Sequence, residues 1–294
     1  MIPSAPDVLK AFELKNMPLQ SNIDTDFLYE NPKIRENLGK LMLAAEKQKF
    51  VVLSGLPGTG KSTLLRKLHD NLEPKKYELF YAATSCATPR WIYINALKQL
   101  GVKPRFFVND LRWQLHDEFR AISAKGKNIV CFFDEGHLLS SVGHGNGYNN
   151  LEEIRFFINT RYDSQSPVTL ILSGQNEIWD YLNQERCVAI AQRIDLICQT
   201  EPLSADEIEK YICAHLAYAE AKDNLFSGAA IDLITEFSGG IPRVINKICE
   251  HALCYIAAAG KTRVGSSDIN NLILNHEIPE CVINISKNSL TGEE

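Results

Sequence analysis

Residues 55–62 read Gly-Leu-Pro-Gly-Thr-Gly-Lys-Ser, and they are the most informative part of the sequence. It fits the pattern G-x-x-x-x-G-K-[ST], in which a glycine loop leaves consecutive backbone N–H groups open to a polyphosphate. The apolar run 50–54 precedes the loop, and residues 62–69 follow it with helical spacing. A strand, a glycine loop and a helix in this order are the context that the pattern requires. The sequence therefore predicts a phosphate-binding loop.

The residue types of this loop indicate its chemistry. Lys61 is predicted to place a positive charge, with a catalytic role, on the β- and γ-phosphates of ATP, and the Ser62 hydroxyl to bind Mg²⁺. The predicted nucleotide-binding residues are those of the loop and the first helical turn: Gly55, Leu56, Pro57, Gly58, Thr59, Gly60, Lys61, Ser62 and Thr63.

A second group of polar residues lies about seventy residues later, where the apolar run 129–133 ends in Asp134 and Glu135. An α/β sheet binds its ligands at the carboxyl ends of its strands. Asp134 is predicted to bind Mg²⁺, and Glu135 to orient and polarise the water that attacks the γ-phosphate.

Polar residues also follow the predicted strand 168–173. Ser173, Gln175 and Asn176 could each contact the γ-phosphate or the attacking water, and a polar turn without a catalytic role explains them equally well. Among the three we favour Gln175.

Two arginines stand out by their positions. Arg193 immediately precedes the predicted strand 195–200, where it could reach the nucleotide of a neighbouring copy, and Arg186 is the alternative for that role. Arg243 follows Gly-Gly-Ile-Pro and lies in the first turn of a predicted helix, where a cation opposes the helix dipole. An anionic partner, the nucleotide, would explain that position, and an ordinary surface charge is the alternative for both arginines.

The composition is that of a globular protein, with 45% hydrophobic and 23% charged residues among 294. We expect no signal peptide and no membrane span, and the eight cysteines form no C-x-x-C pair, so we expect a cytoplasmic protein. A net charge of −5 argues against strong DNA binding by a single copy, but it allows a basic surface built by several copies.

Strands and helices alternate between residues 31 and 202, which predicts an α/β fold with a parallel sheet covered by helices on both faces. After Pro202 the pattern becomes helical and begins with a capping box from Ser204 to Glu207. We therefore predict an irregular N-terminal segment at 1–30, a nucleotide-binding domain at 31–202, a helical domain at 203–276 and a flexible tail at 277–294. The expected strands are 50–54, 78–82, 128–133, 168–173 and 195–200, and the expected helices include 90–100, 110–124, 150–160, 205–221, 228–238, 242–259 and 267–275.

These motifs together resemble the AAA+ ATPases. The resemblance implies a P-loop αβα sandwich with a five-stranded parallel sheet and a helical lid. Within that superfamily, Phe12, the run 26–29, Leu172-Ser-Gly-Gln175 and Gln192-Arg193-Ile194 are similar to the ExeA-like branch. One departure is Gly136-His137, where relatives usually have alanine and then glutamine or histidine.

Two functions are known for proteins that the chain resembles. Larger ExeA proteins energise secretion assembly and carry a membrane span, which we do not find here. Shorter relatives, the phage Mu B protein and the TnsC and IstB families, bind duplex DNA when loaded with ATP, form helical oligomers and recruit a transposase. We therefore expect an ATP-dependent regulator of DNA transposition, with Arg193 supplied between copies and hydrolysis driving disassembly. The alternatives are a secretion or assembly ATPase acting on protein, and a nucleotide-dependent scaffold or switch.

The resembling transposition ATPases contact the DNA backbone in the region after the second strand. Here that region contains Arg90, Lys103 and Arg105, which we predict to bind DNA, with ordinary surface charge as the alternative. The glycine-rich loop 140–150 could become ordered on DNA or on a neighbouring copy.

Overall fold

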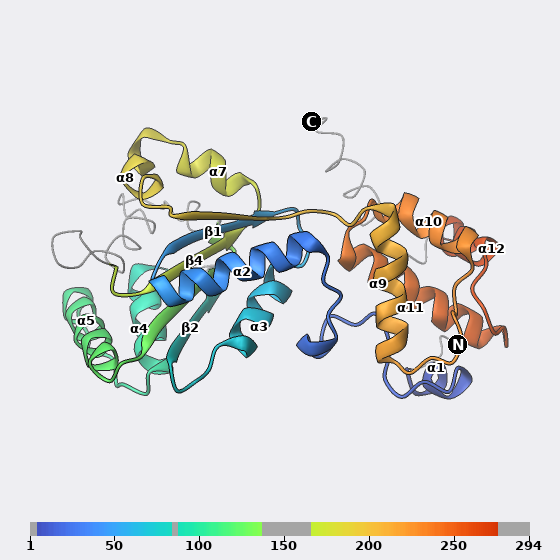
Figure 1. The fold of residues 1–294 in the computed structure, drawn as a ribbon, viewed down its shortest axis with the longest axis horizontal. Helices are drawn as coiled ribbons and strands as arrows, with labels where there is room; N and C mark the ends of the chain where they lie inside the picture. The colour runs from blue at the N-terminus through green and yellow to red at the C-terminus, as the bar shows by residue number, and fades with distance from the viewer. Residues whose placement is uncertain (1–4, 84–87, 137–165, 276–294) are drawn as a thin grey trace. The chain divides into compact units, whose positions relative to one another are not determined.

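A computed structural model describes residues 5–83, 88–136 and 166–275 (Figure 1). The chain divides into two compact units. One contains Pro32–Pro57 and Lys61–Thr200, and the other contains Met1–Asn31, Gly58–Gly60 and Glu201–Glu294. The predicted helix 150–160, the loop 140–150, His137 and the tail 277–294 lie outside the described residues.

The first unit, the sheet unit, is built on a five-stranded sheet in which every paired strand is parallel. The spatial order is β2-β3-β4-β1-β5, and this confirms the predicted α/β fold. β1, β3 and β4 are buried almost throughout, which is why they read as continuous apolar runs. The strands are β1 (Phe50–Gly55), β2 (Tyr77–Ala83), β3 (Asn128–Asp134), β4 (Thr169–Gly174) and β5 (Leu196–Thr200).

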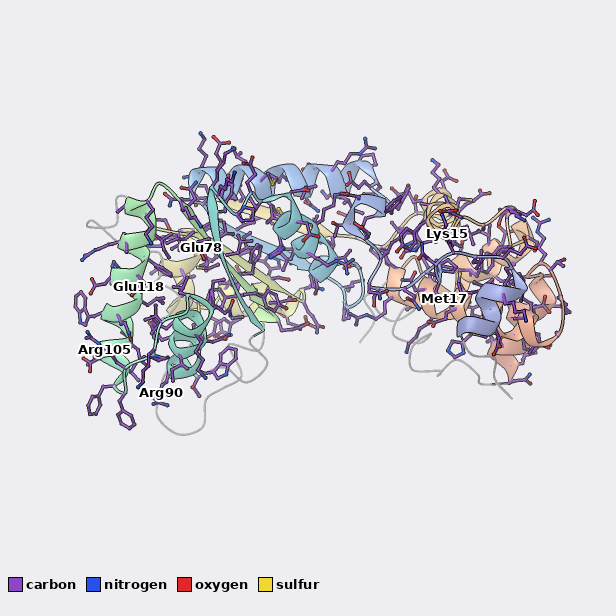
Figure 2. All side chains as sticks on the ribbon, turned by 90° about the horizontal axis from the view of Figure 1, so that it is seen from below. Lys15, Met17, Glu78, Arg90, Arg105 and Glu118 are labelled. Carbon is purple, nitrogen blue, oxygen red and sulfur yellow. The ribbon has the colours of Figure 1, made fainter. Side chains whose placement is uncertain are left out.

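Helices cover both faces of this sheet. Alternate strand residues point to opposite sides, so Phe132 packs in the apolar cluster of α2 and α3, and its neighbour Phe133 packs in that of α4 and α5. In Figure 2, Arg90 and Arg105 lie near each other at one end of this unit. Its helices are α2 (Pro32–Lys47), α3 (Lys61–Asn71), α4 (Pro89–Gln99), α5 (Val108–Ala124), α7 (Glu177–Leu182) and α8 (Val188–Ala191).

The second unit, the helical unit, has its own apolar core, around which four helices between residues 205 and 274 pack. They are α9 (Ala205–Tyr218), α10 (Gly228–Ser238), α11 (Pro242–Ala258) and α12 (Ser266–Leu274). The predicted capping box is present, with the Ser204 N–H donating to the Glu207 carboxylate at 2.9 Å. Gly240 has φ +79°, and a Cβ there would lie 2.2 Å from the Leu203 carbonyl oxygen, so only glycine fits. In the described parts of both units, every helix is too short or too polar to cross a lipid bilayer.

The N-terminal segment differs from the sequence expectation of an irregular 1–30. Residues Ala5–Ala11 form helix α1, and a 3₁₀ helix follows at Thr25–Phe27. Val8, Leu14 and Leu19 are buried in the core of the helical unit. A helix of seven residues is too short to show a clear apolar periodicity in the sequence. It is stabilised mainly by packing against the rest of the helical unit.

A buried histidine joins this segment to α9. His215 is 1% exposed, and its Nδ1 accepts a hydrogen bond from the Leu19 N–H at 3.2 Å. Its buried Nε2 has no hydrogen-bond partner among the described residues. Burial lowers the pKa of His215 to about 4, so the ring is neutral at physiological pH and can act as this acceptor.

We predict that acidification weakens the helical unit through His215. In the unfolded chain the imidazole titrates near pH 6.5, whereas in the folded chain it titrates near 4. Between these values only the unfolded chain takes up the proton, so stability is complete above about pH 6.5 and falls as the pH drops toward 4. The expected loss is about 2 kcal/mol between pH 7 and pH 5, measured by calorimetric unfolding at both values. A His215→Gln variant should lose this pH dependence, and substitution of the exposed His69 by glutamine should retain it. An equal pH dependence in all three proteins would contradict the assignment.

Candidate nucleotide-binding site

The glycine loop lies between β1 and α3, as its sequence pattern predicts. Gly60 has φ +96°, a left-handed conformation that residues with a side chain rarely adopt. Lys61 is the first residue of α3, and the loop therefore leads directly into the N-terminus of a helix, a favourable place for an anion. The Lys61 side chain is buried, and its Nζ donates to the carbonyls of Gly55 at 2.7 Å and Leu56 at 2.9 Å. These two hydrogen bonds offset the free-energy cost of burying the charged ammonium group.

Asp134 is the centre of the site. It is the last residue of β3 and is 4% exposed. Its Oδ2 accepts hydrogen bonds from Ser62 Oγ at 2.9 Å and from the Tyr81 hydroxyl at 3.2 Å. Its Oδ1 accepts from Ser173 Oγ at 2.9 Å and from the Glu135 N–H at 3.0 Å. Donors from α3, β2 and β4 therefore fix the orientation of this carboxylate.

The pair of Ser62 and Asp134 fits a magnesium ion. A hydroxyl and a carboxylate are the hard oxygen ligands that Mg²⁺ prefers. Two adjacent ligands of an octahedral Mg²⁺ lie about 2.9 Å apart, given bonds of about 2.0–2.1 Å. The Ser62 Oγ to Asp134 Oδ2 separation is 2.9 Å, so these two atoms could bind one ion with little movement.

Two further residues contact Asp134. Ser173 is one of the three polar residues singled out after the fourth strand, and it lies inside β4, fully buried beside Asp134 because Leu172 pairs with Phe133. Gln175 and Asn176 follow β4 at the same edge of the sheet, and Asn176 is exposed. The sequence analysis did not predict Tyr81 as a site residue. Its position near the carboxyl end of β2, the strand next to β3, could have indicated it.

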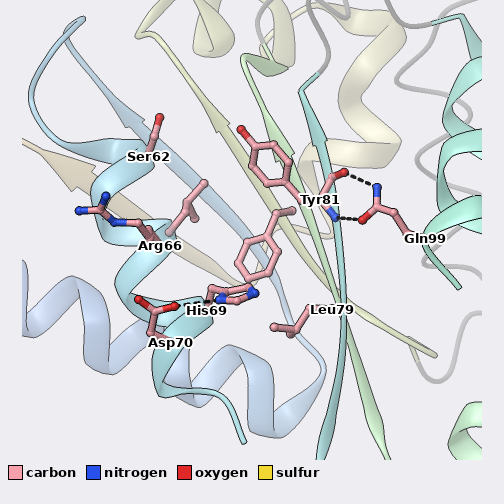
Figure 3. Close-up of a pocket in the computed structure, with 9 residues that line it drawn as sticks. Ser62, Arg66, His69, Asp70, Leu79, Tyr81 and Gln99 are labelled. Carbon is pink, nitrogen blue, oxygen red and sulfur yellow. Dashed lines mark hydrogen bonds and ion pairs between the residues drawn. The ribbon is translucent and has the colours of Figure 1, made fainter. Parts of the chain in front are cut away.

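Tyr81 closes one side of a cavity of about 520 Å³ between α3 and β2 (Figure 3). Its hydroxyl points toward the end of the cavity where Ser62 lies. Burial, and then the nearby Asp134 carboxylate, raises the pKa of Tyr81 to about 12, so it remains a hydrogen-bond donor at neutral pH. The other lining residues are Leu65, Arg66, His69, Asp70, Leu79, Gln99 and Phe132.

Glu135 follows β3 in a strained conformation. Its φ is +57°, which costs a residue with a side chain roughly 1 kcal/mol or more and is concentrated at functional sites. The next residue, Gly136, lies close to β4. A Cβ at Gly136 would lie 2.4 Å from Leu172 Cδ1 and 3.2 Å from the Ser173 carbonyl oxygen, so alanine would require the Leu172 side chain to move.

Arg193 lies at the opposite edge of the sheet from the glycine loop. It precedes β5, and β5 runs parallel to β1 with Leu196 beside Val51 and Thr200 beside Gly55. The glycine loop follows the carboxyl end of β1, whereas Arg193 is at the amino ends of the strands. Arg186 belongs to a short 3₁₀ helix, Glu185–Cys187, and its side chain lies outside the described residues.

Arg243 belongs to the helical unit, where it is the second residue of α11 and follows Pro242. Its N–H donates a hydrogen bond to the carbonyl of Gly58 at 3.3 Å. Gly58 belongs to the same unit. A Cβ at Gly58 would lie 2.9 Å from Arg243 Cβ, so a side chain at that loop position would displace α11's first turn.

The residues predicted to bind DNA are not part of the Asp134 cluster. Arg90 lies on α4, and Lys103 and Arg105 lie on the connection between α4 and α5. All three side chains are exposed.

A parallel sheet in the order β2-β3-β4-β1-β5, with a glycine loop after β1 and an acidic pair at the end of β3, defines a P-loop ATPase fold of the AAA+ type. Residues 44–182 match a protein family described as AAA domain. The fold and this match together support an AAA+ ATPase.

Among curated proteins, the chain is 30% identical over 269 residues to General secretion pathway protein A of Aeromonas hydrophila. The match covers 88% of this chain and 46% of that protein, so the chain spans about half the length of this relative. It supports the predicted likeness to the ExeA-like branch.

Solved structures with the same fold include Drosophila ORC bound to DNA, with a TM-score of 0.67, 16% identity, and coverage of 96% of this chain and 69% of that chain. The Aeropyrum pernix ORC1 protein in complex with DNA has a TM-score of 0.65, 16% identity, and coverage of 87% and 68%. The Thermotoga maritima RuvB Holliday junction branch migration motor has a TM-score of 0.56, 16% identity, and coverage of 90% and 75%. At these identities the likeness shows the fold alone.

Proposed function

We propose that this protein hydrolyses ATP between the copies of an oligomer that assembles on DNA. The observation that carries the proposal is the Asp134 carboxylate, held at the end of β3 by Ser62, Tyr81, Ser173 and the Glu135 N–H. These donors orient the carboxylate, and its Oδ2 lies 2.9 Å from the Ser62 hydroxyl at the start of the helix that follows the glycine loop, so two hard oxygen ligands for Mg²⁺ adjoin the predicted phosphate site.

The residues would divide the chemistry as follows. The amides of the loop from Gly55 to Gly60 and the Lys61 ammonium bind the β- and γ-phosphates, and Thr63 completes the first helical turn. Ser62 and Asp134 would hold Mg²⁺, which would supply positive charge to neutralise the phosphates. Glu135 accepts the proton of the attacking water, and Gln175 orients that water from the end of β4.

The position of Arg193 supports an oligomer. Arg193 precedes β5, at the end of the sheet opposite the glycine loop of its own chain, and from there we propose that its guanidinium serves a nucleotide bound by a neighbouring copy. There it would neutralise charge that develops on the γ-phosphate, as an arginine supplied by another subunit does. Arg243 would instead contact the nucleotide of its own chain. In a ring or a helical filament, each nucleotide could be contacted by Arg243 of its own chain and by Arg193 of the neighbouring copy.

We propose DNA as the partner on which the copies assemble, and transposition as the process. Exposed Arg90, Lys103 and Arg105 at one end of the sheet unit provide phosphate contacts that repetition along a filament would multiply. ATP would favour assembly on duplex DNA, a transposase would be recruited or activated there, and hydrolysis would release the complex. The protein would act in the cytoplasm, where ATP and target DNA are available.

We predict that electron microscopy of the protein with duplex DNA and a non-hydrolysable ATP analogue shows ordered oligomers on the DNA. The same mixture with ADP should show few or none.

An Arg193→Ala variant should bind ATP normally and lose at least about tenfold in hydrolysis, because only the contact between copies is removed. Particles that remain monomeric and unbound under every condition would rule out this assembly.

A second candidate is an assembly ATPase that acts on protein partners. The 30% identity to General secretion pathway protein A over 88% of this chain favours it. If this candidate is correct, oligomers should form with ATP alone and should not bind DNA. The rate of ATP hydrolysis should not change when duplex DNA is added.

A further inference from the structure

An exposed pair of aromatic side chains distinguishes the connection between α4 and α5. Phe106 is 73% exposed and Phe107 is 68% exposed, and their rings lie 5.2 Å apart, nearly perpendicular. Large apolar side chains at such exposure bury little of their surface within the chain and so contribute little to its folding. Phe107 is also the N-cap of α5 and makes no side-chain capping bond. Serine, threonine, aspartate or asparagine at this position would cap the helix better than phenylalanine does.

The backbone beneath these rings is held firmly. Gln114 of α5 donates to the carbonyl of Lys103 at 2.9 Å and accepts from the Arg105 N–H at 3.0 Å. From α4, the Arg90 guanidinium donates to the Phe106 carbonyl through Nε and Nη2, each at 3.4 Å. The same guanidinium lies 5.3 Å from the centre of the Phe106 ring. The rings are therefore presented by a fixed scaffold, which lowers the entropy cost of binding a partner.

The charge around the pair is positive. Residues 88–114 contain five Lys or Arg and one Asp, a net charge of +4, in a chain whose overall net charge is −5. Arg90 and Arg105 lie together at this end of the sheet unit (Figure 2). A partner that matches this surface must present anions and flat apolar groups side by side. Nucleic acid does so at every nucleotide, where a phosphate adjoins a base.

We propose that Phe106 and Phe107 stack on unpaired bases, and that Arg90, Lys103 and Arg105 bind the adjacent phosphates. The aromatic corner formed by these five residues would then prefer DNA whose stacking is interrupted over intact duplex. This inference rests on the proposed DNA binding and specifies which form of DNA is bound. Paired and stacked bases cannot offer their faces to the rings, whereas bases in a single strand or an unpaired bubble can.

The test is fluorescence anisotropy of labelled DNA with the full chain and a non-hydrolysable ATP analogue. Three probes of equal length are compared: a single strand, an intact duplex, and a duplex with an unpaired bubble. We expect the bubble and the single strand to bind roughly tenfold or more tightly than the intact duplex. Phe106→Ala and Phe107→Ala should each remove most of that preference and leave duplex binding nearly unchanged. Phe107→Tyr should keep the preference, since a phenol ring still stacks, and Phe107→Leu should lose it.

Phe27→Ala is the matched control, because Phe27 is 54% exposed but belongs to the helical unit. Arg105→Ala should weaken binding of all three probes and reduce the salt dependence. Equal binding of the three probes by the unaltered protein would overturn the proposal, as would a preference that Phe107→Leu retains. A change in oligomer size without DNA in the phenylalanine variants would also overturn it, in favour of an interface between copies. ATP hydrolysis and assembly on duplex, measured in the same samples, show separately whether the proposed function holds.

Discussion

A Lys61→Ala variant should lose ATP binding, with affinity reduced roughly 100-fold or more. In this structure the Lys61 ammonium is buried and held by the carbonyls of Gly55 and Leu56. A triphosphate would draw the same group into charge-assisted hydrogen bonds, each contributing about 1.5–3 kcal/mol, and alanine removes all of them. Isothermal calorimetry with MgATP measures the loss directly.

Two further variants make this test specific. Lys67→Ala changes a lysine on the same helix, outside the glycine loop, and should bind ATP like the unaltered protein. Lys61→Arg keeps the charge, but a planar guanidinium does not fit the position of a compact ammonium between two carbonyls, so it should also bind poorly. Unchanged affinity of Lys61→Ala would refute the role assigned to the glycine loop.

The sheet could be predicted closely from sequence, for a physical reason. Strands buried on both faces must be apolar throughout, so each of the five runs stands out from its neighbours. Observed strand ends differ from the expected ones by a residue at most, as for 78–82 against Tyr77–Ala83. Helix α1 was missed because its apolar residues are buried only by contact with the rest of the helical unit. A segment of seven residues is too short for its sequence pattern to indicate that contact.

The site was predictable where it follows a contiguous motif and unpredictable where it depends on strand register. Ser62 and Asp134 are far apart in sequence, yet their motifs indicated both, and the structure brings them within 2.9 Å. Tyr81 reaches Asp134 only because β2 pairs with β3 in the register that sets Tyr81 beside Phe132. The register is set by packing across the sheet, which a single sequence does not record. The same register argument separates Ser173, which contacts Asp134, from Gln175 and Asn176, whose roles remain predictions.

A Glu135→Gln variant should bind ATP normally and lose about 10²- to 10⁴-fold in turnover. The amide has the size of the carboxylate and tolerates the same backbone conformation, so the bond from the residue 135 N–H to Asp134 should persist. The amide cannot accept the proton of the attacking water, and this is the contribution that general base catalysis makes. In the proposed function, assembly needs only bound ATP, so oligomers on DNA should become longer-lived in this variant.

Steady-state phosphate release and calorimetric ATP binding, measured on the same preparation, separate the two effects. Glu177→Gln provides the control, since Glu177 is an exposed carboxylate at the start of α7 near the same edge of the sheet, and its loss should change neither quantity. If Glu135→Gln lost both binding and turnover, Glu135 would be part of the support of Asp134 and not the base. If it retained full turnover, the water would be activated by another group, and the polar residues after β4 would be the next to substitute. A loss confined to turnover is the result that the strained position of Glu135, directly beside the carboxylate proposed to bind Mg²⁺, leads us to expect.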